Sequence, residues 1–219
     1  GSDRPAGIDR FRFFNSRFAL KLRAEPVAPR ITVEQTTQAT FLGTQLRLAV
    51  DLKYDIREAG TSRLKIEVPE NVELDGDSSG AEYLEDVEID DTNGSLTILL
   101  ARKVTGTVGV SFTGTRYLEE TEFSEPERLP MFRPDGVERE SGRITLFAVP
   151  GLDVFVPDAN RYGIQPAAPN AAPPSAGTRA VSAWTYQRQP IAVPVRVVRR
   201  PTRATASSST SLDIGLERM

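Results

Sequence analysis

The 219-residue sequence contains no cysteine and no histidine. Without cysteine the chain has no disulfides, no thiolate nucleophile and no thiolate metal site. Without histidine it lacks the commonest general base and the commonest transition-metal ligand. Most hydrolase triads and most zinc centres are therefore excluded, and we expect a protein that is not an enzyme and has no required cofactor.

The sequence also lacks long apolar runs and a strong charge of either sign. No stretch has the length of a membrane span or the pattern of a signal peptide, so we expect no direct membrane insertion of this segment. The opening Gly1-Ser2 is typical of a tag remnant, and we expect any targeting signal to lie outside these residues. The net charge of −3 gives no general attraction to nucleic acid, and no nucleic-acid motif is present.

Helical periodicity is missing as well, and a two-residue period takes its place. Apolar residues alternate with polar ones along residues 46–56, 64–68 and 96–100, which predicts strands with one buried face, and residues 104–112 predict a further strand pair or a bulged strand. Asn93-Gly94 between two such runs predicts a hairpin turn. Short strands separated by turns are typical of antiparallel sandwiches. We predict an all-β chain of two tandem antiparallel β-sandwich (immunoglobulin-like) modules.

A polar, proline-containing stretch at residues 118–127 suggests where the two modules divide. The first module is predicted to span residues 30–117, and the second, smaller module residues 118–198. Within the second, residues 165–177 are rich in proline and alanine, and we expect them to form an exposed loop.

The same pattern opens and closes the chain, 173 residues apart. No gap is needed to align the two copies over about thirty positions, and a fixed period is typical of a repeated architecture. The matching features are Phe11-x-Phe13 with Trp184-x-Tyr186, residues 18–23 with residues 191–196, and Arg30-x-Thr32 with Arg203-x-Thr205.

We interpret the repeat as a joint between modules. Residues 1–29 then contain the tag remnant and a joining strand equivalent to residues 184–198. Residues 199–219 are the start of the next repeat or a tail. The repeated aromatics have two interpretations, an aromatic ligand platform or packed core residues at a joint, and we favour the second.

The segments at residues 11–20, 183–191 and 136–156 resemble the tandem β-repeat modules of large, uncharacterised bacterial cell-envelope proteins. The resemblance implies a periplasmic, cell-surface or secreted location and no known activity. We therefore expect a non-catalytic structural or interaction module of a larger repetitive envelope or extracellular protein. Its expected partners are neighbouring modules of the same protein, other envelope proteins or polysaccharide. The alternative is a carbohydrate-binding module, assisted by Ca²⁺.

Carboxylates are concentrated between Glu70 and Asp91. Within this run Asp75 and Asp77 flank a glycine, and oxygen ligands on a flexible loop suit Ca²⁺. The spacing is not that of an EF-hand, because Asp86 occupies the place of the twelfth-position glutamate. The other interpretation, which we favour, is a charged edge that prevents sheets from pairing edge to edge.

Arginines dominate the opposite part of the sequence, since no carboxylate occurs between Asp158 and Asp213. This stretch predicts a patch for an anionic ligand or for the acidic face of a neighbouring module. The other interpretation is protection of a sheet edge together with an arginine-rich genome composition. The candidate residues are Arg188, Arg196, Arg199, Arg200 and Arg203.

A glycosidase needs two carboxylates near one substrate and no histidine. Glu138 and Glu140 would share a strand face, but their alternation with Arg139 beside Gly142 suggests an exposed hairpin. We therefore do not assign them a catalytic role.

Overall fold

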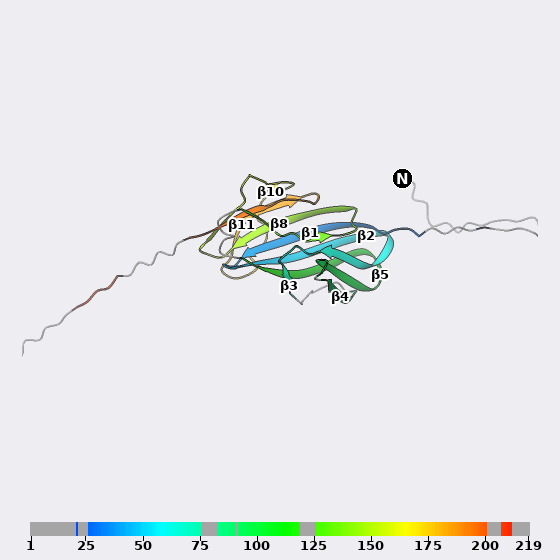
Figure 1. Ribbon diagram of the computed structural model, residues 1–219, viewed down its shortest axis with the longest axis horizontal. Coiled ribbons are helices and arrows are strands. Elements are labelled where there is room, and N and C mark those ends of the chain that lie inside the picture. Colours follow the sequence, from blue (N-terminus) through cyan, green and yellow to red (C-terminus); the bar gives the residue numbers. More distant parts are fainter. Residues whose placement is uncertain are drawn as a thin grey trace, which may run out of the picture.

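The computed structural model describes a body built of β-strands (Figure 1). The predicted all-β class is confirmed. No helix in the described part of the chain is long and apolar enough to cross a membrane. The described residues are 21, 26–75, 83–90, 92–118, 126–200 and 207–211.

The strands follow one another along the described chain as follows. They are β1 (Arg30–Phe41), β2 (Gln45–Glu67), β3 (Glu73–Leu74), β4 (Leu84–Asp90), β5 (Ser95–Tyr117), β6 (Glu127–Arg128), β7 (Arg133–Pro134), β8 (Arg139–Ala148), β9 (Leu152–Phe155), β10 (Gln165–Ala167), β11 (Arg179–Tyr186) and β12 (Pro194–Arg199).

These strands form one large mixed sheet and one small antiparallel sheet. The large sheet has nine strands with the order β10-β11-β8-β1-β2-β5-β3, with β4 also pairing with β5 and β7 with β2. The small sheet has the order β6-β12-β9. The large sheet is mixed because β1 pairs with β8 in parallel, whereas β1 pairs with β2 antiparallel.

The described strands do not separate into two tandem antiparallel sandwiches. The physical reason is the β1–β8 ladder, which hydrogen-bonds a strand of the first predicted module to a strand of the second. Residues 119–125, where we expected the boundary, lie outside the described residues. The division at residues 117 and 118 stays a prediction.

Several strands are longer than the alternation suggested. β2 and β5 each run for 23 residues, and their register shifts between Ile56 and Thr61 without ending either strand. The alternation is interrupted there because the backbone turns at Glu58, which has a positive φ of 66°. The predicted hairpin is confirmed, since β4 and β5 pair up to Asp90 and Ser95. Within the predicted loop at residues 165–177, the first three residues instead form β10, which pairs with β11.

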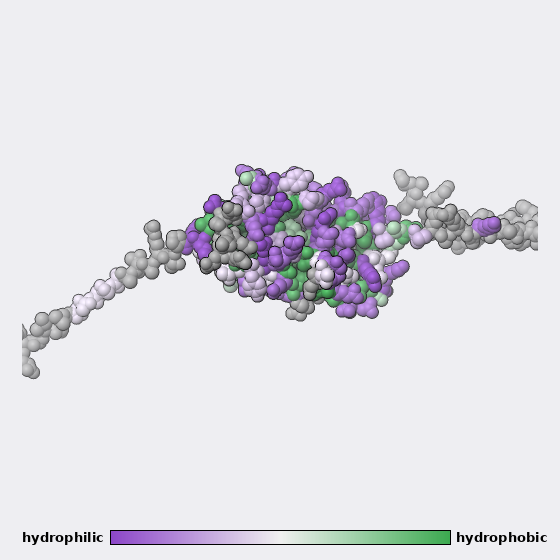
Figure 2. Space-filling model, in the orientation of Figure 1, coloured by the Kyte–Doolittle hydropathy of each residue, from purple (hydrophilic) through white to green (hydrophobic). Residues whose placement is uncertain are grey.

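The core lies between the inner face of the large sheet and the small sheet. Alternate residues of β1 and of the regular parts of β2 and β5 are buried on this inner face, and β8, β9 and β12 contribute apolar residues to the same cluster. Leu48, Val50 and Leu52 are each no more than 1% exposed, as the alternation predicted. Hydrophilic side chains cover most of the face shown in Figure 2.

We predict that Val50→Asp unfolds this body. Val50 lies between Thr37 of β1 and Phe112 of β5, so the new carboxylate would be buried without a partner. The expected loss is about 4 kcal/mol or more of unfolding free energy, measured by urea denaturation. Lys53→Gln on the exposed face of the same strand is the control, expected to change stability by less than about 0.5 kcal/mol. Equal stability of the two variants would show that the inner face is assigned wrongly.

Candidate functional site

The repeated aromatic residues of β11 are core residues. Trp184 is 7% exposed and Tyr186 is 2% exposed, which excludes both as an open ligand platform. The guanidinium carbon of Arg161 lies 4.9 Å from the centre of the Trp184 ring and covers it. The packing of these aromatics in the core is confirmed for the second copy, and their role as a joint between modules stays a prediction. Phe11 and Phe13 lie outside the described residues.

Tyr186 lies directly over a glycine of the neighbouring strand. β11 pairs Tyr186 with Gly142 of β8, and a Cβ atom at position 142 would lie 2.6 Å from the tyrosine ring. Such a distance is far inside van der Waals contact, so the ring can occupy its place only because residue 142 has no side chain.

The Tyr186 hydroxyl points to a buried carboxylate, and these groups form the most unusual polar cluster of the inner face. Tyr186 Oη donates a hydrogen bond of 2.9 Å to Glu140 Oε1, and Gln189 Nε2 donates one of 2.7 Å to the same oxygen. Gln189 Nε2 also donates to the backbone carbonyl of Phe132 at 2.9 Å. We call Glu140, Tyr186 and Gln189 the Glu140 cluster. It ties the segment after β11 to β8.

Burial dominates the electrostatics of this cluster. Glu140 is 7% exposed, and desolvation raises the pKa of its carboxyl above the ordinary value, although the two hydrogen bonds oppose the shift. Desolvation, followed by the charge of Glu140, raises the pKa of the Tyr186 and Tyr54 hydroxyls. Both tyrosine hydroxyls therefore stay protonated, and Glu140 is the member of the cluster that can take up or release a proton.

Two further polar atoms are buried on the inner face near this cluster. Tyr54 of β2 pairs with Val33 of β1, and Val33 pairs on its other side with Glu140 of β8. Within the described residues, neither the Tyr54 hydroxyl nor Gln35 Oε1 has a hydrogen-bond partner, although Gln35 Nε2 donates to Thr37 Oγ1 at 3.0 Å. Buried polar atoms without partners are costly, so this part of the core carries a stability cost.

The sequence-based assignment of Glu138 and Glu140 to an exposed hairpin was half right. Glu138 is exposed and is held by Arg30, which lowers the pKa of its carboxyl through a hydrogen bond. Glu140 is buried instead. The signal was present in the alternation, because Glu140 continues the period of Ile144, Leu146 and Ala148 onto the inner face.

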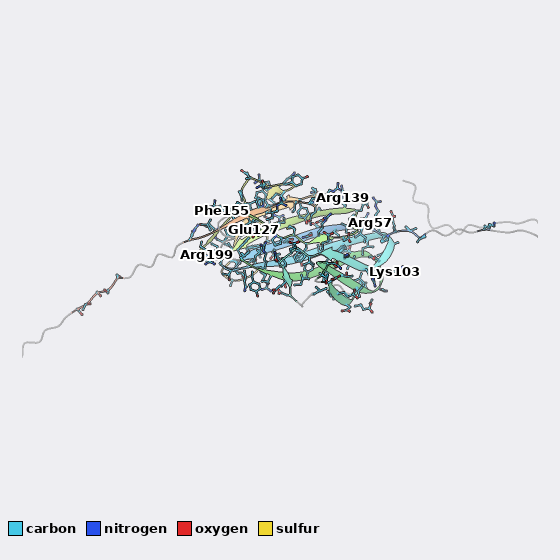
Figure 3. All side chains as sticks on the ribbon, viewed as in Figure 1. Arg57, Lys103, Glu127, Arg139, Phe155 and Arg199 are labelled. Carbon is cyan, nitrogen blue, oxygen red and sulfur yellow. The ribbon has the colours of Figure 1, made fainter. Side chains whose placement is uncertain are left out.

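The predicted arginine patch is distributed over two places. Arg188 lines a polar groove near the start of β1, together with charged residues of β1, β2 and β8. Arg196, Arg199 and Arg200 lie exposed on or just after β12. Figure 3 shows Arg199 and the groove residue Arg139 at different ends of the body. Arg203 lies outside the described residues.

The predicted calcium residues have different outcomes. The Asp75 carboxylate accepts a hydrogen bond of 2.6 Å from the Thr113 hydroxyl, and its backbone N–H donates to the Thr113 carbonyl at 2.9 Å. Asp75 is thus fixed at the end of β3 by β5. Asp77 lies outside the described residues. In the part of the chain that the structure describes, no three acidic side chains are grouped so as to hold a metal ion. The Ca²⁺ site stays a prediction.

No protein-family model matches this sequence, and a search of curated proteins finds no significant relative. Functional interpretation therefore has to come from the geometry and from the sequence repeat.

We predict that Gly142→Ala destabilises the protein by about 1–3 kcal/mol, because the new methyl group displaces the Tyr186 ring. Thermal unfolding should show a midpoint lowered by about 2–4 °C for each kcal/mol. Gly109→Ala is the matched control in β5, since a Cβ there meets no atom within 4 Å. Equal midpoints for the two alanine variants would contradict the packing of Tyr186 on Gly142.

We predict opposite pH dependences for Glu140→Gln and Glu138→Gln. The raised pKa of Glu140 means that its ionisation costs stability as the pH rises, so Glu140→Gln should be more stable than the wild type at neutral pH. The lowered pKa of Glu138 means that its ionisation adds stability, so Glu138→Gln should be less stable at neutral pH.

The Glu140 difference should vanish in acid, below the ordinary glutamate pKa of about 4.3, where this carboxyl is protonated in the folded and the unfolded chain. The Glu138 difference should persist to lower pH, because it is lost only as the pH falls through the lowered pKa of the folded chain. Urea denaturation at several pH values measures them. A Glu140→Gln variant that is less stable than the wild type at neutral pH would show that the ionised carboxylate stabilises the cluster.

Proposed function

We propose that this chain is a non-catalytic structural and interaction module of a larger repetitive bacterial envelope or extracellular protein. The observation that carries the proposal is that the 173-residue sequence period agrees with the length of chain that forms the folded body. The position 173 residues after Arg30, where β1 begins, is Arg203, and β12 ends at Arg199. One period therefore corresponds to one body, and the unit repeated in tandem is the pair of packed sheets.

The arrangement of the chain supports a linear array of such units. β1 begins at one end of the long axis, which we call the leading end, where Arg30 pairs with Arg57 (Figures 1 and 3). β12 ends near Arg199 at the opposite end, which we call the trailing end (Figure 3). When the chain enters each unit at one end and leaves at the other, successive units follow one another along one axis, as in repeat proteins.

The partners and location in this proposal follow from the resemblance of the repeated segments to bacterial envelope modules. Neighbouring modules of the same protein are the first partners. Other envelope proteins or polysaccharide are further partners, and the location is periplasmic, cell-surface or secreted.

A carbohydrate-binding module, assisted by Ca²⁺, is the second candidate function. The observation that favours it is the exposure of aromatic side chains, with Tyr117 60% and Tyr162 67% exposed. Exposed aromatic faces are typical contacts for sugar rings, and Arg188, Thr32 and Ser141 are among the residues that line the polar groove near the start of β1.

The complete gene product and a glycan array together separate the two functions. The scaffold proposal expects further copies of the pattern at the 173-residue period and no glycan binding. It also expects no rise of the unfolding midpoint in millimolar Ca²⁺, because a bound ion would stabilise the fold in proportion to the logarithm of its concentration. Selective glycan binding that is lost in Tyr117→Ala or Tyr162→Ala would overturn it in favour of the second candidate.

A further inference from the structure

The leading end carries two carboxylates around one guanidinium. Arg30 binds Glu138 through two side-chain hydrogen bonds, and its Nη1 lies 3.7 Å from a Glu58 oxygen. Glu58 and Glu138 remain 52% and 48% exposed. These residues line a hollow together with Ala28 and Pro29. The lining of this hollow carries one negative charge in excess, while Arg57 and Arg139 lie in the adjoining groove that shares Arg30 and Glu138.

The trailing end carries the reverse arrangement. Asp153 accepts hydrogen bonds from Arg200 at 2.6 and 2.7 Å, and it lies 3.2 Å from Arg179. Arg179 and Arg200 are 51% and 66% exposed, whereas Asp153 is 22% exposed. The trailing end therefore presents two guanidinium groups around one carboxylate, with one positive charge in excess.

The sequence repeat makes the link between successive units very short. Arg200 is fixed to the body, because its backbone N–H donates to the Gly151 carbonyl at 2.8 Å and its side chain binds Asp153. Arg203 has the position of Arg30, which is clamped by Glu138 at the first residue of β1. Only Pro201 and Thr202 lie between. Three residue steps span at most about 11 Å.

A link of this length leaves the two bodies no room to separate. The backbone is fixed from the first residues of β1, since the Glu138 N–H donates to the Ile31 carbonyl at 2.8 Å. Each link sequence also contains one proline, Pro201 here and Pro29 before the first copy of β1, at positions one residue apart in the repeat.

We infer that successive units pack end to end, and that the trailing end of one unit docks on the leading-end hollow of the next copy. The docking pairs Arg179 and Arg200 with Glu58 and Glu138. The inference rests on the proposed function as a repeated module. Free chains would associate only weakly through exposed ion pairs, but a short tether raises the effective concentration of the two ends to the millimolar range or above.

A tandem protein tests the inference. A second copy of residues 30–202 is inserted after Thr202 of the full chain, so that both ends meet through the natural link. The chain has no cysteine, so Asp51→Cys in each of the two copies gives two unique sites for spin labels. Asp51 is exposed and lies in the middle of the β1–β2 ladder, six residues from Arg57. Pulsed electron double resonance then measures the distribution of distances between the labels.

The expected result is a narrow distance distribution. The control is the same tandem with ten glycine and serine residues inserted between Thr202 and the second Arg30, for which the distribution should be broad. Equally broad distributions for the direct and the extended tandem would overturn the inference.

Charge variants test the docking itself. Arg179→Gln in the first copy and Glu58→Gln in the second should each broaden the distribution of the direct tandem, as should high salt. Arg63→Gln in the first copy and Glu88→Gln in the second are matched controls at exposed sites that do not line the hollow, and they should leave the distribution unchanged. A distribution that no charge variant alters would overturn the proposed ion pairing.

The two proposals fail in different ways. The distance measurement involves no ligand, so glycan binding by the chain would overturn the scaffold function without changing the distribution. A broad distribution in the direct tandem would overturn the end-to-end packing even where further sequence copies exist.

Discussion

The structure depends on the central position of β1. This strand pairs antiparallel with β2 along its whole length and in parallel with β8 from Thr32 to Phe41. Through these two ladders it connects the β2–β5 half of the large sheet to the β8–β11–β10 half. The inner-face residues of all these strands then face the small sheet and form one core. Loss of β1 would therefore divide both the sheet and the core.

The alternation of apolar residues was sufficient to predict the strands and much of the core. Leu48, Val50 and Leu52 are buried as their period required, and the hairpin before Ser95 lies where Asn93-Gly94 placed it. Alternation tells which residues of a strand share a face, but not which strands lie side by side. The parallel ladder between β1 and β8 joins residues more than a hundred positions apart, so no local pattern could reveal it. The prediction of separate sandwiches failed at that ladder.

The Glu140 cluster shows a second limit of sequence reasoning. Because a glutamate is normally exposed, the prediction gave more weight to the charge of Glu140 than to the strand period, which places this residue on the inner face. Its burial is tolerable because Tyr186 and Gln189 donate to it, and those partners lie more than forty residues further along the chain. Gly142 is needed because it leaves space for the Tyr186 ring, whose hydroxyl donates to Glu140. Such a cluster is specified by the tertiary structure, and only the repeat of the aromatic positions marked it in the sequence.

The direction in which the chain crosses the body has a mechanical consequence. β1 starts at the leading end, and the chain leaves after β12 at the trailing end (Figure 1). Tension between these points pulls β1 along its own axis and loads its hydrogen bonds to β2 and β8 in shear. Those bonds have to break together rather than one after another, whereas β12, on which the other end of the tension acts, is held only by its short ladders to β6 and β9. Under end-to-end tension the attachment of β12 is therefore weaker than that of β1.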